Sequence, residues 1–521
     1  ANPMLRKVLQ MSVHWLSETS MADAKTAIFL GPVSEDVLHT ECKKYPKGVL
    51  WITSSGTNGG ASPPNIKVIQ SSSDRETIRE ATQEILLAEY NHQPEVKVSK
   101  RTEENPSNPY PAILSLILAE TDSTLRSRKS REEGGHQRQR HVFMNLSGYL
   151  RGRVPEEWRD LANGSLAVVV GAGPSLDETL PLIKEGFPRP WVIAADSSLR
   201  ALRSEGVIPD FVVSIDSEKT FLSCSEPDHS PGVAVLSSQS HESWAKEWGA
   251  RSCFLSGRVL TEDWLAEKGI SKTKLQAVNN AGLTALLFAD FLGPGTIIMT
   301  GMDLSGGGSG QLRYADSTER GHIQIQTNLY HKIPGNFEPS VPTPFLSDWE
   351  ETSVLVKEIS QRRMIINLND RGALLDGAVV IHPKDIDELR SVIDQNLTPF
   401  EATTHAILEK RRSLQGHGMH QLLTLLATRC DQVWKGFPEK GYNSMIDYLK
   451  NLLADRDLAN LIGDFAFTVL PKIAPESTMD EEELKKALNQ LQELAWRLED
   501  AIMECDPNDE FVVRFLTEKF C

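Results

Sequence analysis

The 521-residue sequence lacks the features that mark several large classes of protein. Its six cysteines are scattered and form no CxxC pair, so neither a disulfide framework nor a zinc site is expected. No apolar run approaches the roughly 20 residues that span a bilayer, and no secretory signal pattern opens the chain. The net charge of −16 argues against nucleic acid as a partner. These absences predict a cytoplasmic protein without a membrane span.

The order of apolar segments predicts an α/β protein of four parts. Residues 1–106 alternate short strands and helices and are expected to form a small N-terminal α/β domain, followed by a helical connector at 107–165. Residues 166–390 alternate strands and helices repeatedly, which predicts a Rossmann-like domain on a parallel sheet. Residues 391–521 contain no convincing strand and are expected to form an α-helical C-terminal domain.

Short apolar runs bounded by turn residues mark the expected strands. In the N-terminal domain the predicted strands are 27–30, 49–53 and 66–69, and the predicted helices are 35–45 and 74–90. In the central domain the predicted strands are 166–170, 191–195, 211–215, 233–236, 253–255, 296–300 and 364–367, with helices at 282–291 and 348–363.

The segment 166–178, LAVVVGAGPSLDE, predicts a buried strand, a tight turn and a helix start. Gly171 and Gly173 let the backbone turn sharply and approach a ligand, and Pro174 suits the first helical position. Free N–H groups and the helix dipole at such a turn attract phosphate, so a nucleotide site is expected here. The dinucleotide fingerprint would place a third glycine where the chain has Leu176, which argues against an ordinary NAD enzyme.

Polar residues follow several predicted strands, at the edge where doubly wound sheets bind ligands. Asp196, Asp216 and Asp303 each follow a strand, and Asn279 and Asn280 precede a helix. One such aspartate commonly caps the next helix, but three in register could act as hydroxyl acceptors, a general base or Mg²⁺ ligands. The two asparagines could cap the helix or contact a base or phosphate.

His322 lies in the loop after Asp303 and is a candidate base, although a lone histidine is more often a surface residue. No residue is assigned as a metal ligand. The basic run 126–140 is interpreted as a solvated helix face or loop, with contact to an acidic partner as the alternative. A capping box at 478–481 precedes a leucine stripe, which predicts a core-facing helix.

Several segments, in order, resemble the domain shared by motility accessory factors (Maf) and MptE-like 6-hydroxymethylpterin diphosphokinases. The resemblance covers roughly residues 160–385 and extends to bacterial CMP-sialyltransferases. The segments are GAGPSLDETLPLI (171–183), WVIAADSSLRAL (191–202), IPDFVVSIDS (208–217), NNAGLTALLFADFLGPGTIIMTGMDLS (279–305), KIPGNFEPSVPTPFLSDWE (332–350) and MIINLNDRGALLDGA (364–378).

The resemblance also implies roles for individual residues. It places the nucleotide phosphate at the glycine turn, the ribose or base after the second strand, and the reacting centre near two aspartates. Carried over by motif, the phosphate would be held by Gly171, Gly173, Pro174 and Ser175. The ribose or base would meet Asp196 and Ser197, and the sugar nucleotide would be flanked by Asn279 and Asn280. The reaction would take place near Asp216 and Asp303. Arg200 and Arg313 are candidate cations for an acidic donor sugar.

The function implied by this resemblance is transfer of a nonulosonic acid, of pseudaminic or legionaminic type, from a CMP donor to Ser or Thr of flagellin or a similar protein. No cofactor is expected beyond the donor substrate. Two alternatives stay open. One is Mg²⁺-dependent pyrophosphoryl transfer from ATP to a pterin alcohol, with Asp216 and Asp303 as metal ligands. The other is a non-catalytic flagellin-binding or assembly factor.

Overall fold

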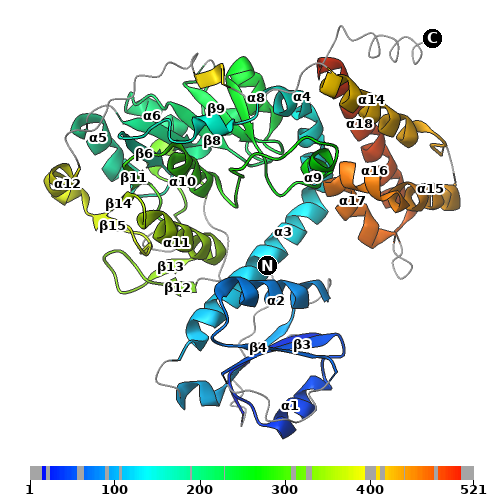
Figure 1. The fold of residues 1–521 in the computed structure, drawn as a ribbon, viewed down its shortest axis with the longest axis horizontal. Helices are drawn as coiled ribbons and strands as arrows, with labels where there is room; N and C mark the ends of the chain where they lie inside the picture. Colours follow the sequence, from blue (N-terminus) through cyan, green and yellow to red (C-terminus); the bar gives the residue numbers. More distant parts are fainter. Residues whose placement is uncertain are drawn as a thin grey trace. The chain divides into compact units, whose positions relative to one another are not determined.

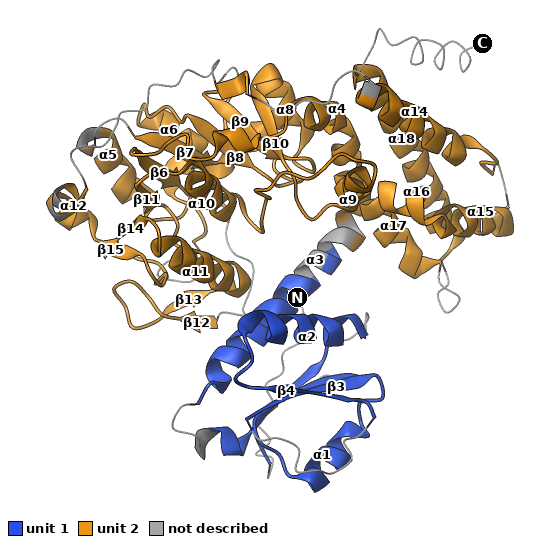
Figure 2. Ribbon diagram, viewed as in Figure 1, with its two compact units in different colours: residues 1–129 blue, residues 130–521 orange. Residues whose placement is uncertain are grey.

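The structure of the chain is a computed structural model (Figure 1). The residues that it describes are 14–18, 24–54, 64–88, 93–104, 108–187, 190–227, 229–306, 312–323, 331–393, 407–410, 417–438, 441–473 and 479–505. The chain divides into two compact units, residues 1–129 and 130–521 (Figure 2). The boundary lies within the long helix α3 (Tyr110–Met144). The predicted division into four parts stays a prediction.

The first unit contains a five-stranded sheet in the order β1-β5-β2-β3-β4. Its elements are β1 (Trp15–Glu18), β2 (Thr26–Leu30), α1 (Glu35–Cys42), β3 (Gly48–Thr53), β4 (Ile66–Gln70), α2 (Arg75–Ala88) and β5 (Glu95–Ser99). The predicted strands and helices of this region are confirmed. Strands β1 and β5 were not predicted, and β1 is antiparallel to β5 whereas the other pairs are parallel.

The second unit is built on an eight-stranded parallel sheet in the order β10-β9-β8-β7-β6-β11-β14-β15. The strands are β6 (Leu166–Val170), β7 (Trp191–Ala195), β8 (Phe211–Ser214), β9 (Val233–Ser237), β10 (Ser252–Leu255), β11 (Thr296–Thr300), β14 (Met364–Leu368) and β15 (Val379–Ile381). The predicted strands of the central region are all present, and β15 is an additional edge strand. A short hairpin, β12 (His331–Ile333) and β13 (Val341–Thr343), forms a separate two-stranded sheet.

Helices cover both faces of this sheet, which makes the fold doubly wound α/β. Val168 and Val170 of β6 point into one buried cluster with α5, α6 and α8, whereas Ala167 and Val169 point into another with α10 and α11. The helices are α5 (Leu176–Gly186), α6 (Leu199–Ser204), α7 (Phe221–Cys224), α8 (Glu242–Trp248), α9 (Leu260–Glu267), α10 (Ala281–Leu292), α11 (Leu346–Ser360) and α12 (Ile386–Val392). The expected Rossmann-like sheet is therefore confirmed.

The C-terminal part of the second unit is helical in the described residues. It contains α14 (His417–Trp434), α15 (Tyr442–Ala454), α16 (Arg456–Leu461), α17 (Gly463–Val469) and α18 (Glu481–Cys505). The predicted leucine stripe of α18 is buried. Thr478 lies outside the described residues, and Asp480 caps the helix by accepting a hydrogen bond from the Glu483 N–H (2.8 Å). None of the helices that the structure describes has the length and apolarity needed to cross a membrane.

The end of the basic run 126–140 is packed, so its interpretation as a solvated face is wrong there. The run lies within α3, which α4 (Leu146–Arg151) follows. Gln139 is 1% exposed and its amide donates to Thr261 Oγ1 (3.0 Å). Arg140 forms ion pairs with Glu493 (3.0 Å) and Glu242 (3.5 Å). Helix periodicity alone did not reveal this packing, because the partners are more than 100 residues away in sequence.

Candidate active site

The strand order reverses between β6 and β11, and the loops that follow these two strands lie against each other. The N–H groups of Gly171 and Gly173 donate to the carbonyl oxygens of Thr300 and Gly301, both at 2.8 Å. A Cβ atom at Gly171 would lie 2.3 Å from the Gly301 oxygen. The two glycines are therefore required for close contact between loops, whether or not a ligand approaches them.

Asp303 occupies the N-terminus of α5. Its Oδ2 accepts a hydrogen bond from the Ser175 N–H (2.8 Å), and its Oδ1 accepts one from Asn369 Nδ2 (2.8 Å). The side chain is 2% exposed, and burial raises the pKa of Asp303. Helix α5 begins at Leu176, so Pro174 lies in the turn rather than at the first helical position. The N–H groups of Gly171, Gly173 and Ser175 are not free, and a phosphate at this helix start would have to displace the Asp303 carboxylate.

A second group of polar residues lies beyond β7 and β8. Asp196, which is 1% exposed, accepts hydrogen bonds from the Ser197 N–H (2.6 Å) and from Ser214 Oγ (3.1 Å). It also forms an ion pair with Lys219 at 3.0 Å. Burial lowers the pKa of Lys219, but the Asp196 and Asp216 carboxylates and the Tyr314 phenol outweigh this effect and raise it above its usual range. Lys219 is therefore held as an ammonium group.

The segment 312–323 brings two further cations to this edge of the sheet. It is fixed to the glycine turn by a hydrogen bond from the Ala315 N–H to the Ala172 oxygen (3.0 Å). The Tyr314 ring lies 5.1 Å from the Arg313 guanidinium carbon and 5.0 Å from that of Arg320. Both distances are those of cation–π contacts.

Arg320 is 7% exposed and donates from Nη1 to the Ser223 carbonyl (2.6 Å). Its Nε forms no hydrogen bond, and among the described residues no carboxylate pairs with it. A buried guanidinium without a counter-ion is costly, so this geometry favours binding of an anion. Cys224 lies between Arg320 and the residues around Asp196, since its Sγ is 3.5 Å from Arg320 Nη1 and 4.0 Å from Ser197 Oγ.

We call Asp196, Asp216, Lys219, Tyr314 and Arg320 the Lys219 cluster. Asp216 is half-buried, and its Oδ1 accepts a hydrogen bond from the Glu218 N–H (2.9 Å). Asp303 is not part of the cluster. Strands β7 and β6 separate β8 from β11, so the strand ends that carry Asp216 and Asp303 are roughly 14 Å apart at the usual strand spacing. The structure brings two of the three predicted aspartates together, and the third stabilises the glycine turn.

Three further predicted site residues, Asn279, Asn280 and His322, lie in different surroundings. Asn280 caps α10, because its Oδ1 accepts a hydrogen bond from the Leu283 N–H (2.8 Å). Asn279 is exposed and hydrogen-bonds to Glu351. His322 is exposed, and its ring makes no hydrogen bond or ion pair with the rest of the described chain. The roles proposed for Asn279 and His322 stay predictions, whereas the capping alternative is confirmed for Asn280.

Sequence reasoning missed Lys219, Arg320 and Asn369. Lys219 follows Asp216 by three residues and could have been found as a cation after a strand. Arg320 and Asn369 carry no local signal, because their partners are about 100 and 66 residues away. Of the cations that were predicted, Arg313 contacts Tyr314, and Arg200 donates to the Leu222 carbonyl (2.8 Å).

Part of the second unit matches a known protein family. Residues 140–307 match the family described as 6-hydroxymethylpterin diphosphokinase MptE-like. The MptE-like stretch carries Asp196, Asp216 and Lys219 but ends before Tyr314 and Arg320.

The comparison with curated proteins gave no match. A solved structure of a MAf glycosyltransferase from Magnetospirillum magneticum AMB-1 is similar over 95% of this chain and 82% of its own, at 14% sequence identity and a TM-score of 0.45.

Proposed function

We propose that the chain is a glycosyltransferase that moves a nonulosonic acid from a CMP donor to a Ser or Thr hydroxyl of flagellin or a similar protein. The observation that carries the proposal is the pair of cations in the Lys219 cluster: Lys219, which is partly buried and held by Asp196, and Arg320, which is buried and has no carboxylate partner in the described chain. Such a donor bears two anions, a phosphate and a carboxylate, and therefore matches two cations. The order of Maf-like segments along the sequence supports this donor class.

The proposed reaction breaks the bond between the anomeric carbon of the donor sugar and the CMP phosphate oxygen. The acceptor hydroxyl oxygen forms the new bond to that carbon, and CMP leaves with the electron pair. One of the two cations, Lys219 or Arg320, stabilises the negative charge that develops on the leaving phosphate, and the other pairs with the carboxylate of the sugar. Asp216 takes the proton of the acceptor hydroxyl. Of its two carboxylate oxygens, only Oδ1 accepts a hydrogen bond from the described part of the protein.

Calorimetry with CMP, CTP, ATP and GTP, with and without Mg²⁺, tests the ligand class. Tight CMP binding that ignores the metal supports the proposal. ATP binding that requires Mg²⁺ contradicts it. Intact CMP-sugar binding without turnover, measured with an acceptor protein present, would indicate a non-catalytic binding factor.

Variants of the two cations test the site. Because Arg320 lacks a carboxylate partner, Arg320→Gln removes the positive charge without leaving a buried carboxylate unpaired. We expect it to weaken CMP-donor binding at least about tenfold. Lys184→Gln, at an exposed lysine of α5, is the matched control and should bind the donor like wild type. Equal binding by both variants would remove Arg320 from the site.

Asp216→Asn tests the base. Loss of a general base typically lowers the rate about 10²–10⁴-fold, so we expect transfer to fall in this range while donor affinity is unchanged. The measurement is single-turnover transfer from a saturating donor. Full transfer by Asp216→Asn would assign the proton to another group.

A second candidate, pyrophosphoryl transfer from ATP to a pterin alcohol, is supported by the match of residues 140–307 to the 6-hydroxymethylpterin diphosphokinase MptE-like family. It needs Mg²⁺ ligands, and the separation of Asp216 from Asp303 argues against their sharing one ion. Loss of activity in EDTA that Mg²⁺ but not Zn²⁺ restores would favour this candidate over the glycosyltransferase.

A further inference from the structure

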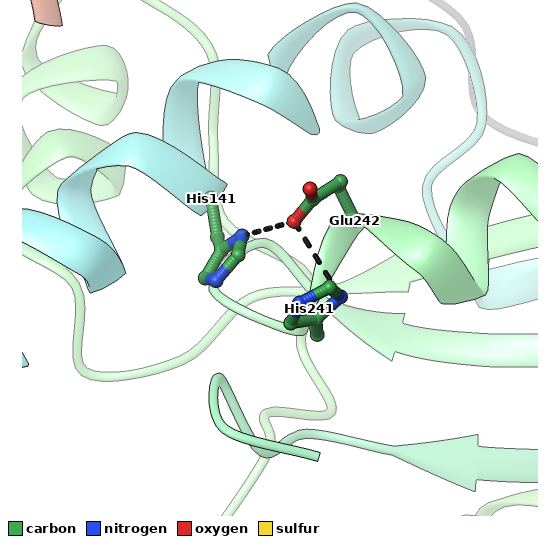
Figure 3. A group of neighbouring side chains, drawn as sticks. All are labelled: His141, His241 and Glu242. Carbon is green, nitrogen blue, oxygen red and sulfur yellow. Dashed lines mark ion pairs between the residues drawn. The ribbon is translucent and has the colours of Figure 1, made fainter. Parts of the chain in front are cut away.

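Two histidines and one glutamate meet close to the carboxyl ends of β8 and β9. His141 lies in the last turn of α3, His241 is the N-cap of α8, and Glu242 is the first residue of α8 (Figure 3). His141 Nδ1 lies 2.6 Å from Glu242 Oε2, and His241 Nδ1 lies 3.5 Å from the same oxygen. One ligand atom from each of the three residues falls within 4.8 Å of the other two. In Figure 3 both imidazole rings lie next to the same oxygen of the Glu242 carboxylate.

Two of these atoms are buried without a hydrogen bond. His141 is 0% exposed, and neither its Nδ1 nor Glu242 Oε2 has a hydrogen-bond partner within the described residues. His141 Nδ1 and Glu242 Oε2 form an ion pair with each other at 2.6 Å. Arg140 and Lys246 lie 3.5 and 3.9 Å from the other carboxylate oxygen, Oε1. Oε2 is therefore the oxygen that the two histidines approach.

The ligand types suit a metal of the zinc class. Imidazole nitrogen and carboxylate oxygen are ordinary ligands of Zn²⁺, and histidine must be neutral to coordinate. The amide of Gln137 lies 3.0 Å from His141 Nε2, where its oxygen, after a rotation of the amide, can accept the ring N–H and fix the tautomer.

We propose that His141, His241 and Glu242 form a binding site for a divalent transition metal such as Zn²⁺, with a water molecule as the remaining ligand. His241 would bind through Nε2, because its Nδ1 accepts the Ser243 N–H (3.2 Å) at the N-cap of α8. Three protein ligands and one open position is the arrangement of reactive zinc sites rather than of closed structural ones. Glu242 and Lys246 border a cavity of about 940 Å³ that Met144 and Arg497 also line, which provides a path for solvent and the metal.

The proposed metal site is close to a residue of the Lys219 cluster. The His241 N–H donates a hydrogen bond to the Asp216 carbonyl oxygen (3.2 Å), so a metal here would stiffen the loop that carries Asp216. The metal proposal does not depend on the glycosyltransferase proposal, because metal binding is measured without donor or acceptor.

The test uses the full chain stripped with a chelator and dialysed against Zn²⁺ or Co²⁺. We expect one bound ion per chain by elemental analysis, and a Co²⁺ visible spectrum of the intensity typical of four-coordinate sites. His141 is fully buried, so its removal risks misfolding, and two milder variants are used. Glu242→Gln keeps the side-chain shape, and His241→Asn keeps a residue that can accept the N-cap hydrogen bond from the Ser243 N–H.

Both variants should lose metal affinity at least about 100-fold, in keeping with removal of one of three ligands. His382→Asn is the matched control for His241→Asn. His382 is also an N-cap and accepts a hydrogen bond from the Lys384 N–H, but in the described chain it belongs to no group of three possible metal ligands. Glu247→Gln is the control within α8. A wild-type chain that binds no Zn²⁺ or Co²⁺ would overturn the proposal, as would equal binding by Glu242→Gln and Glu247→Gln.

Discussion

Two regions at the carboxyl edge of the sheet differ in whether their charged groups are paired within the protein. At the glycine turn, the Asp303 carboxylate receives hydrogen bonds on both oxygens from Ser175 and Asn369, so its polar groups are satisfied within the protein. In the Lys219 cluster, Arg320 is buried with Nε unbonded and without a carboxylate partner in the described chain. In the first region the carboxylate is paired within the protein and only the buried Ser175 Oγ has no hydrogen bond in the described chain, whereas the second region has a buried guanidinium that an anion would neutralise.

The comparison shows that a glycine-rich turn is not by itself a phosphate site. A strand, a turn and a helix start provide N–H donors, but a carboxylate from a neighbouring loop can use them as well as a phosphate can. The same turn still has a functional consequence, because the Ala172 oxygen holds the segment that carries Tyr314 and Arg320. The turn thus positions the cluster.

The largest expected effect comes from Asp303→Ala. It leaves the Ser175 N–H and the Asn369 amide buried without a partner, which should cost about 2–5 kcal/mol of unfolding free energy. Denaturant unfolding followed by tryptophan fluorescence measures the loss. Asp216→Ala, at a half-buried aspartate, should cost less than about 1 kcal/mol. If Asp303→Ala unfolds like wild type but loses donor binding, the glycine turn is the ligand site.

Gly173→Ala is expected to have the next largest effect. The added Cβ would lie 2.4 Å from Asp303 Oδ2 and 2.8 Å from the Gly301 oxygen, so the loops must separate, at about 1–3 kcal/mol. Gly134→Ala is the control, because nothing lies within 4 Å of its added Cβ in helix α3, and it should stabilise by about 0.5–1 kcal/mol. Thermal unfolding distinguishes the two. Unchanged stability in Gly173→Ala would show that the loops are not in close contact.

Glu262, in the first turn of α9, is a further carboxylate at this sheet edge and extends the comparison. It is 1% exposed and accepts hydrogen bonds from Ser238 Oγ (2.5 Å) and the Gly257 N–H (2.7 Å). Burial raises the pKa of Glu262 from its usual 4.5 to about 7. The folded state therefore holds this proton more tightly than the unfolded state does, and its contribution to stability falls as the pH rises from about 5 to about 7.

We expect the contribution of Glu262 to the unfolding free energy to fall by about 2 kcal/mol between about pH 5 and about pH 7. It is measured as the difference in unfolding free energy between wild type and Glu262→Gln at each pH, because the amide cannot titrate. A difference that stays constant, or that grows with pH, would contradict the raised pKa.

The smallest expected effect is that of Asn280→Ala. Loss of the N-cap of α10 should cost about 1 kcal/mol while donor affinity stays the same. Asn279→Ala, at an exposed neighbour, should change stability by less than about 0.5 kcal/mol. Calorimetry with the CMP donor provides the second measurement. A loss of donor affinity in Asn280→Ala with normal stability would make Asn280 a ligand-binding residue instead of a cap.

Much of the fold could be predicted because buried strands carry their signal locally. The predicted ranges 166–170, 191–195 and 296–300 coincide with β6, β7 and β11, each of which is fully buried. Strands β5 and β15 were missed for different reasons. The sequence of β5, EVKVS, contains two charged residues, and β15 has only three residues, so each depends on pairing with a neighbour rather than on its own apolar character.

The candidate site was predicted in part. Asp196 and Asp216 were placed at the carboxyl ends of strands, and both contribute to the Lys219 cluster. The metal cluster was not predicted, because no short motif links His141 to residues 100 positions later, His241 and Glu242.

The sequence by itself determined the parallel sheet, its carboxyl edge and the aspartates along that edge, since burial and turn formation are set by neighbouring residues. Only the tertiary structure decided which polar groups satisfy one another. Asp303 binds the glycine turn across 128 residues, and Arg320 reaches Ser223 across 97. Hydrogen bonds and ion pairs depend on distances of a few ångströms in space, and separation along the chain does not encode these distances.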